Sequence, residues 1–219
     1  GIGSTSGFPY FDAGGWFDTT ITGSTDAYIC RFDSNNALTW GTLIGGDNND
    51  VINVLGVSDD KVYIAGGGGQ NFPVYDAGNG AYFDSSYAGI FFTVFSKSTT
   101  QKLHSTYLGG SGVDRIYGMC FNGIGDVFLA GTSSSVDFPV IDPGNGAYFD
   151  DTYADSVDLF ITQLDGVSWS QKWGTYYGST AAESMVDQNC IAADINCDNV
   201  HLLVQTSQNI TDTRNFLPT

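Results

Sequence analysis

The chain is patterned as a series of short segments in which apolar and polar residues alternate. All but one of these segments are seven to nine residues long, and Gly, Asn or Asp residues are common between them. Alternation with a period of two residues predicts a β-strand, and Gly, Asn and Asp between such segments predict tight turns. No long stretch has the 3.6-residue period of an amphipathic helix. In the first part of the chain, the predicted strands are 26–33, 39–46, 50–58 and 61–67.

The same order of segments occurs three times. A Phe-Pro pair opens each unit at Phe8, Phe72 and Phe138, and a variant, "NFLPT", closes the chain. Each pair begins a loop, "YFDAGGWFD", "VYDAGNGAYFD" or "VIDPGNGAYFD", and four strand-like segments follow it. The later segments are 89–96, 103–110, 114–122 and 126–132, then 158–165, 172–179, 183–194 and 199–206.

A repeat of this kind predicts an all-β protein in which each unit is a sheet of four antiparallel strands. Four-stranded sheets repeated head to tail are the blades of a β-propeller. The units span about 8–71, 72–137 and 138–215, and the loop after each Phe-Pro pair is expected to connect one blade to the next. Because propellers close with about 4–8 blades, we expect residues 1–219 to be one segment of about three blades from a longer chain.

The segment "STYLGGSGVDRIYGMCFNGIGDVFLAGTSSSVDFP" (105–139) resembles the SBBP repeat, a bacterial β-propeller repeat family. The resemblance covers nearly the whole chain and is weakest in the third unit, which has extra residues around 180–198. The "DAGNGAYFD" loop resembles versions of this repeat in large secreted proteins of the Bacteroidetes type. The resemblance therefore implies a secreted or cell-surface location in a bacterium.

Composition agrees with a folded β protein and excludes several classes of partner. Of 219 residues, 42% are hydrophobic and 29 are glycine, and the net charge is −17. Glu183 is the only glutamate among the 24 acidic residues, so most of the acidity belongs to aspartates, which favour turns. So negative a surface repels phosphate backbones and anionic lipids, and we expect neither nucleic-acid binding nor membrane insertion.

The cysteines and the chain start give little direct information on compartment. Cys30, Cys120, Cys190 and Cys197 lack the CxxC spacing of a zinc site. Cys30 and Cys120 lie in predicted strands, where buried free thiols are the favoured interpretation, and the disulfide state of all four stays open. No apolar run reaches the ~20 residues of a membrane span, and no signal peptide opens the chain.

No arrangement of residues predicts catalysis. His104 occupies the strand position held by Trp40 and Trp173 in the other units, and His201 occupies a similar packing position, so both histidines are expected to be structural. "AGGGGQN" (65–71) lacks the Lys-Ser/Thr of a phosphate-binding loop. The acidic residues recur in every unit, whereas a catalytic pair normally occurs once per domain. We therefore expect no enzyme activity.

The loop after Phe-Pro is the first candidate for a bound cation. Asp76 and Asp84 recur as Asp142 and Asp150, and carboxylates beside glycine carbonyls suit Ca²⁺. The alternative is that these aspartates form turns, for which they are also well suited. The segment 194–199, "DINCDN", has a similar spacing but lacks the glycine and the distant glutamate of a calcium loop.

Three loop aromatics, Trp16, Tyr82 and Tyr148, are candidates for ligand contact, and the alternative is that they pack on their own sheet. The sequence thus favours a non-catalytic scaffold or binding segment with protein or glycan partners, or with the remaining blades of the same chain. A carbohydrate-active enzyme and a calcium-stabilised adhesin remain alternatives, because propellers carry many functions.

Overall fold

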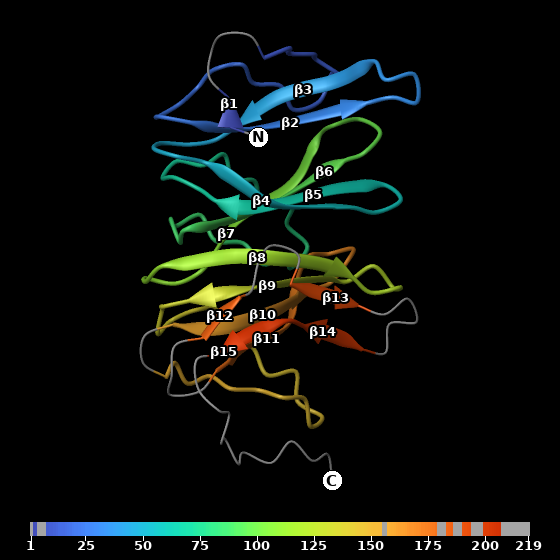
Figure 1. Cartoon of the computed structure of the whole chain (residues 1–219). Coiled ribbons are helices and arrows are strands. Elements are labelled where there is room, and N and C mark those ends of the chain that lie inside the picture. Colours follow the sequence, from blue (N-terminus) through green and yellow to red (C-terminus); the bar gives the residue numbers. More distant parts are fainter. Residues whose placement is uncertain are drawn as a thin grey trace. The chain divides into compact units, whose positions relative to one another are not determined.

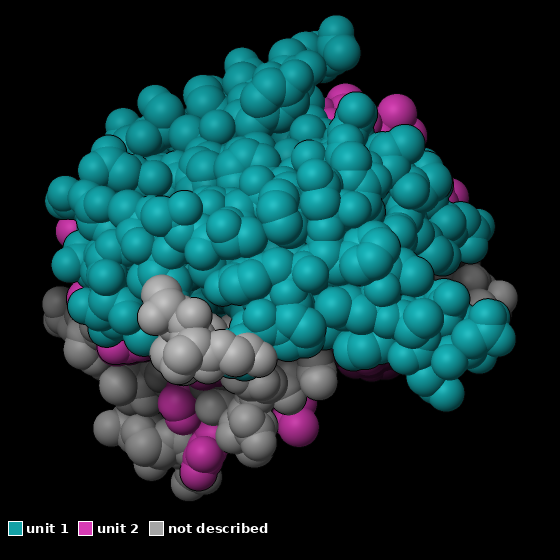
Figure 2. Space-filling view, turned by 90° about the horizontal axis from the view of Figure 1, so that it is seen from above, with its two compact units in different colours: residues 1–108 teal, residues 109–219 magenta. Residues whose placement is uncertain are grey.

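The computed structural model describes residues 2–3, 8–154, 157–178, 183–185, 190–193 and 199–206. All regular structure in these ranges is β-strand, with no helix. The all-β prediction is therefore confirmed. The chain divides into two compact units, residues 1–108 and residues 109–219 (Figure 2).

The first unit contains two antiparallel sheets (Figure 1). The N-terminal sheet has the order β1-β2-β3, from Ile2–Gly3, Asp26–Phe32 and Leu38–Ile44. The first four-stranded sheet has the order β4-β5-β6-β7, from Val51–Val57, Lys61–Gly67, Ile90–Ser96 and Lys102–Leu108. Apart from β1, for which no segment was predicted, these bounds lie within two residues of the predicted segments, because alternating burial and turn residues together define them.

The second unit contains one further four-stranded sheet and two short strand pairs (Figure 1). The second four-stranded sheet has the order β11-β10-β9-β8, from Gln171–Tyr177, Asp158–Leu164, Val127–Ser133 and Asp114–Phe121. We name the two short pairs the C-terminal strand pairs. They are β12 with β15, Glu183–Met185 and Val204–Thr206, and β13 with β14, Ile191–Ala193 and Val200–Leu202.

The sheets are out of phase with the sequence repeat. β5 pairs with β6 from Lys61↔Ser96 to Gly67↔Ile90, although a Phe-Pro loop separates the two strands in sequence. β9 and β10 pair in the same way across the next Phe-Pro loop. The expectation that this loop connects one blade to the next is therefore wrong, because it joins neighbouring strands of one sheet. Glycine-rich segments, 45–50 and 109–113, connect the successive sheets instead. The number of blades and ring closure stay predictions.

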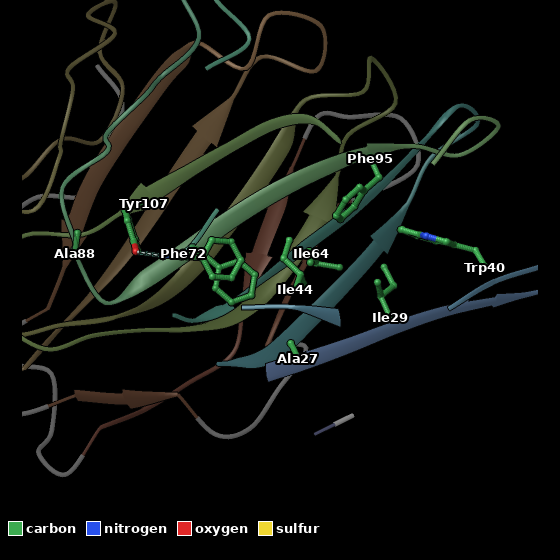
Figure 3. Close-up of a cluster of buried hydrophobic side chains, with 10 residues drawn as sticks. Ala27, Ile29, Trp40, Ile44, Ile64, Phe72, Ala88, Phe95 and Tyr107 are labelled. Atoms are coloured by element: carbon green, nitrogen blue, oxygen red, sulfur yellow. Dashed lines mark hydrogen bonds between the residues drawn. The ribbon is translucent and has the colours of Figure 1, made fainter. Parts of the chain in front are cut away.

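Apolar side chains between the two sheets of the first unit form its core (Figure 3). Ile29 and Trp40 of the N-terminal sheet pack in one cluster with Ile64 and Phe95 of the first four-stranded sheet. The Trp40 and Phe95 rings meet edge to face, with centroids 5.2 Å apart. β6 is buried along almost its whole length, so the side chains on both of its faces are covered.

The phenylalanines of the second and third Phe-Pro pairs fix their loops to the sheets that contain them, whereas Phe8 of the first pair is 37% exposed. Phe72 is buried and stacks on Phe91 of β6, with ring centroids 4.1 Å apart and an interplanar angle of 15°. Phe138 stacks on Phe160 of β10 at 4.3 Å. These two Phe-Pro pairs are thus internal anchors of their sheets.

A buried tyrosine hydroxyl completes each anchor. The Tyr107 hydroxyl donates to the Gly69 carbonyl at 2.7 Å. It also accepts the Phe72 N–H at 2.9 Å (Figure 3). The Tyr176 hydroxyl contacts the Ser135 carbonyl and the Phe138 N–H in the same way. One side chain therefore satisfies two backbone groups where the chain leaves β5 or β9.

We expect Tyr107→Phe to lower the free energy of unfolding by about 2–3 kcal/mol, because it leaves a buried N–H and a buried carbonyl unpaired. Urea unfolding followed by tryptophan fluorescence measures the change. Tyr87→Phe is the matched control: Tyr87 is exposed, and its loss of a hydroxyl should change stability by no more than about 0.5 kcal/mol. Equal effects of the two changes would contradict the anchor.

Candidate functional site: the Phe-Pro loops

We name residues 8–25, 72–89 and 138–154 the Phe-Pro loops. Each loop runs along the last strand of a sheet, β3, β7 or β11, and pairs with that strand at one point. The pairs are Phe11↔Gly41, Tyr75↔Ser105 and Ile141↔Gly174. The loops are therefore held in equivalent positions on the three sheets.

A ring nitrogen on the same edge strand binds each loop a second time. The indole N–H of Trp40 donates to the Trp16 carbonyl at 3.0 Å, and that of Trp173 donates to the Tyr148 carbonyl at 2.9 Å. His104 takes this place on β7, with its Nε2 3.1 Å from the Tyr82 carbonyl. The prediction that His104 has a structural role, like Trp40 and Trp173, is therefore confirmed.

The surroundings of His104 favour its neutral form. Its side chain is fully buried, and its Nδ1 accepts the Ala77 N–H at 3.4 Å. An Nδ1 that accepts leaves Nε2 as the protonated donor toward Tyr82. Burial lowers the pKa of His104. The ring is thus a loop anchor with a fixed tautomer.

Asp84 and Asp150 form turns at the end of their loops. The Asp84 N–H donates to Thr106 Oγ1 at 2.8 Å, and its Oδ1 accepts the Ser86 N–H at 2.7 Å. Asp150 makes the same two contacts, with Thr175 Oγ1 at 2.8 Å and the Thr152 N–H at 2.9 Å. In the first loop, Asp18 also repeats this arrangement.

Asp76 and Asp142 form turns at the start of their loops. Each Oδ1 accepts the backbone N–H of a glycine two residues later, Gly78 or Gly144, at 2.7 Å. The next residues, Asn79 and Asn145, have positive φ angles of 56° and 58°. Among the described residues, no three His, Cys, Asp or Glu side chains gather as a metal site would require. Calcium binding by these aspartates therefore stays a prediction, and the turns alone account for their positions.

Substitution of Asp84 separates the turn from the cation. Asp84→Asn keeps an oxygen for the Ser86 N–H, so we expect a change in unfolding free energy below about 0.5 kcal/mol. Asp84→Ala removes the acceptor and should cost about 1 kcal/mol. Thermal melts with excess EDTA or with added Ca²⁺ complete the test. A melting temperature that rises with Ca²⁺ in the wild type but not in Asp84→Asn would favour the cation instead.

The three candidate contact aromatics are half-buried and pack on their own sheets. The Trp16 indole N–H donates to the Leu43 carbonyl at 3.1 Å, and Lys102 lies 3.9 Å from its ring centroid. Tyr148 meets Tyr177 edge to face at 5.7 Å. Burial raises the pKa of Tyr82. These contacts support the packing alternative, although none of them tests ligand binding.

Another set of loop residues exposes more apolar surface. Phe11, Tyr75 and Ile141, the residues that pair with the edge strands, are 47%, 52% and 40% exposed. Each lies between the proline and the first aspartate of its loop. The sequence did not lead us to these residues, although an apolar residue recurs directly before the first aspartate of each loop and could have indicated them.

Buried carboxylates form a second feature that sequence reasoning missed. Asp50 lies fully buried and accepts the N–H groups of Gly46 at 2.9 Å and Gly69 at 2.8 Å. Asp126 is buried against Lys172, with Nζ 2.8 Å from Oδ2. Asp26 is fully buried, and its Oδ2 accepts the Thr22 N–H at 3.2 Å. Burial, reinforced by Asp50 and Asp18, raises the pKa of Asp26 to about 6.

Asp26 should make stability depend on pH. Because its folded-state pKa is raised, its contribution is complete below pH about 4 and is lost as the pH rises through about 6. Asp26→Asn imitates the protonated form, so its stability relative to the wild type should increase by up to about 3 kcal/mol between pH 4 and pH 8. Urea unfolding at the two pH values measures this difference. A constant difference would show that Asp26 ionises freely in the folded chain.

Several remaining predictions have mixed outcomes. Cys30, Cys120 and Cys190 are thiols rather than disulfides. Cys30 is exposed, so the prediction that it is buried is wrong; it lies on the incompletely paired edge of β2.

His201 is exposed on β14 rather than packed. Cys197 and most of the segment 194–199 lie outside the described residues. Gly66 and Gly67 end β5, as the strand interpretation of "AGGGGQN" requires.

The chain matches no protein-family model, and it matches no curated protein sequence. Since the described ranges contain no helix, they offer none that could cross a bilayer.

Proposed function

We propose that this chain is a non-catalytic scaffold of repeated four-stranded sheets that presents anchored loops to a protein or glycan partner. We propose further that it belongs to a large secreted or cell-surface bacterial protein with repeats of the SBBP type. The resemblance of residues 105–139 to that repeat supports the location and the family.

The observation that carries the proposal is the recurrence of the loop anchors. A ring N–H, a threonine hydroxyl and a backbone pair hold the Phe-Pro loop in the same way on β3, β7 and β11. The loop aspartates bind backbone N–H groups in equivalent turns. Polar groups that recur at equivalent positions in every repeat are suited to a structural role. Loops held on a rigid scaffold are suited to binding.

The contact residues that we assign are Phe11 and Tyr75 in the first unit and Ile141 in the second, each on its own Phe-Pro loop. Each is exposed, apolar and fixed by backbone pairing to an edge strand. Each is followed by an aspartate, Asp12, Asp76 or Asp142, which supplies polar contacts at the rim. Apolar anchors with a polar rim are the usual composition of a protein or glycan contact.

Array binding combined with a chemical assay tests this proposal. The whole chain is applied to a glycan array and a peptide array, and the bound glycans are assayed in solution for new reducing ends. We expect retention on at least one array without chemical change to the bound molecule. Retention should fall by about tenfold or more in the triple variant Phe11→Ser, Tyr75→Ser, Ile141→Ser.

The matched control changes three exposed apolar residues outside the Phe-Pro loops, Ile124→Ser, Val136→Ser and Val167→Ser. It should bind like the wild type. Release of reducing ends would favour the carbohydrate-active alternative. Absence of retention on both arrays, or equal losses in the two triple variants, would contradict the assigned contact residues.

A further inference from the structure

We propose that a cavity at the start of the second Phe-Pro loop binds a neutral sugar. The cavity has a volume of about 490 Å³ and lies between the segments 70–74 and 85–87. This volume is within the range of about 300–1,000 Å³ that is typical of small-molecule sites. All of its lining residues belong to the first unit, and none is one of the contact residues assigned above. Either assignment can therefore fail without the other.

The floor of the cavity is a pair of buried aromatic rings. Phe72 and Tyr107 line the cavity and are each 2% exposed. Stacking on Phe91 holds the Phe72 ring, and two hydrogen bonds hold the Tyr107 hydroxyl (Figure 3). Because that hydroxyl already donates and accepts, the floor offers mainly apolar surface. A floor that is fixed before the ligand arrives lowers the ordering cost of binding.

One wall of the cavity is an exposed tyrosine. Tyr87 lines the cavity and is 54% exposed. Its ring meets the Tyr107 ring edge to face, with centroids 5.8 Å apart and planes at 84°. The buried ring thus supports the exposed one. A sugar ring has a face of C–H groups, which packs favourably on the apolar surface of an aromatic side chain.

Uncharged polar side chains form the rim of the cavity. Gln70, Asn71 and Ser85 line the cavity and are exposed. The Asn71 Nδ2 donates to Asp47 Oδ2 at 2.7 Å, which orients the amide and leaves its oxygen as an acceptor. In the part of the chain that the structure describes, the Gln70 amide and the Ser85 hydroxyl form no hydrogen bond to protein. Amides and hydroxyls can both donate to and accept from sugar hydroxyls.

The charges around the cavity disfavour an acidic ligand. Among the described residues that line the cavity, none is charged. Two carboxylates lie beside the rim, since Asp47 is bonded to Asn71 and Asp84 directly precedes Ser85. Carboxylates without a neighbouring lysine or arginine repel an anionic ligand. A ligand with an apolar face and uncharged hydroxyls therefore fits best, and a neutral sugar has both.

The rim differs at the corresponding place in the second unit. Val136 and Asp137 hold the positions of Gln70 and Asn71 before the next Phe-Pro pair. Asp137 Oδ1 accepts the Ser111 N–H at 2.7 Å and the Ser111 hydroxyl at 3.0 Å. These hydrogen bonds lower the pKa of Asp137. A valine and an ionised carboxylate thus replace the two amides, so the second unit provides matched controls.

Titration of the whole chain with neutral glycosides, followed by NMR, tests the site. The probes are the methyl glycosides of glucose, galactose and mannose. We expect at least one of them to shift the side-chain amide signals of Gln70 and Asn71, with a Kd of about 1–10 mM, because a single sugar ring makes few contacts. The matching uronic acid glycoside, in which a carboxylate replaces the CH₂OH group, should bind at least about tenfold more weakly.

Two outcomes of the titration would overturn the proposal. One is the absence of amide shifts with all of the neutral glycosides at about 50 mM, well above the expected Kd. The other is equal binding of the neutral glycoside and its uronic acid counterpart.

Substitutions at the wall and the rim locate the bound sugar. Tyr87→Ala removes the ring and should weaken binding by about tenfold or more, whereas Tyr87→Phe keeps the ring and should stay within about twofold of the wild type. Gln70→Val, which copies Val136, should weaken binding by about fivefold, because it removes one hydrogen-bonding amide. Both substituted residues are exposed, so the variants should keep the spectrum of the folded chain.

Tyr153→Ala is the matched control for Tyr87→Ala. The Tyr153 ring centroid lies 6.2 Å from that of Tyr176, much as Tyr87 lies against Tyr107. This variant should bind the glycoside like the wild type. Equal losses from Tyr87→Ala and Tyr153→Ala would contradict binding at this cavity.

The triple variant Phe11→Ser, Tyr75→Ser, Ile141→Ser separates the cavity from the contact residues. It should still bind the glycoside, because none of the three side chains lines the cavity. Loss of glycoside binding in this variant, with binding kept in Tyr87→Ala, would place the sugar on the contact residues and overturn the proposal.

Discussion

Gly66→Ala is expected to destabilise the first unit by about 3 kcal/mol or more, because overpacking against backbone atoms cannot be relieved by a side-chain rotation. A Cβ at Gly66 would lie 1.8 Å from the Val51 carbonyl oxygen. The irregularity between Ile52 and Val54 brings β4 this close to β5. The second four-stranded sheet repeats the arrangement at Gly131, where a Cβ would lie 2.0 Å from the Arg115 oxygen. Urea unfolding monitored by tryptophan fluorescence measures the loss.

Gly67→Ala is a control one residue away on the same strand. A Cβ at Gly67 meets nothing within 4 Å, and Thr132 occupies the equivalent position in β9. We expect this change to be neutral or to stabilise the chain by up to about 1 kcal/mol, since alanine restricts the unfolded chain more than glycine does. Similar losses for Gly66→Ala and Gly67→Ala would show that the close approach of β4 to β5 is absent.

Phe91→Ala is expected to lower the free energy of unfolding by about 3–5 kcal/mol. Phe91 is fully buried on β6, belongs to the core between the two sheets of the first unit and stacks on Phe72. Its removal leaves a cavity and also frees the Phe-Pro anchor. Hydrogen exchange should therefore become faster in the loop after Phe72 as well as in β6.

Phe17→Ala provides the comparison for Phe91→Ala, because Phe17 lies in a Phe-Pro loop and is 40% exposed. It should cost no more than about 1 kcal/mol. If Phe91→Ala left exchange in the loop unchanged, then the stacking of Phe72 on Phe91 would not be what anchors the loop.

Strand positions could be predicted because the two signals that define them are local. Alternating burial and Gly/Asn/Asp turns place β2 and β6 within a residue of the predicted segments. The grouping of strands into sheets could not be predicted in the same way. A repeat in sequence has no marked starting point. The pairing of β5 with β6 depends on hydrogen bonds between strands that the Phe-Pro loop 72–89 separates, and the sequence alone does not show such long-range pairing.

The candidate site was predicted in part. The equivalence of Trp40, His104 and Trp173 was visible in the sequence, and the structure gives it a common purpose, a ring nitrogen bound to a loop carbonyl. The exposure of Cys30 could not be predicted, because it depends on which edge of β2 is paired. Burial of Asp26 likewise depends on packing between sheets rather than on its local sequence.

The central claim is that the four-stranded sheets are out of phase with the sequence repeat, so that each Phe-Pro loop lies within a sheet. Cross-strand NOEs in solution test it most directly. The account predicts contacts between β5 and β6 in the register Ile64↔Thr93 and Ala65↔Phe92, and between β9 and β10 in the register Leu129↔Thr162. Ladders of NOEs between β3 and β4, with none between β5 and β6, would contradict it.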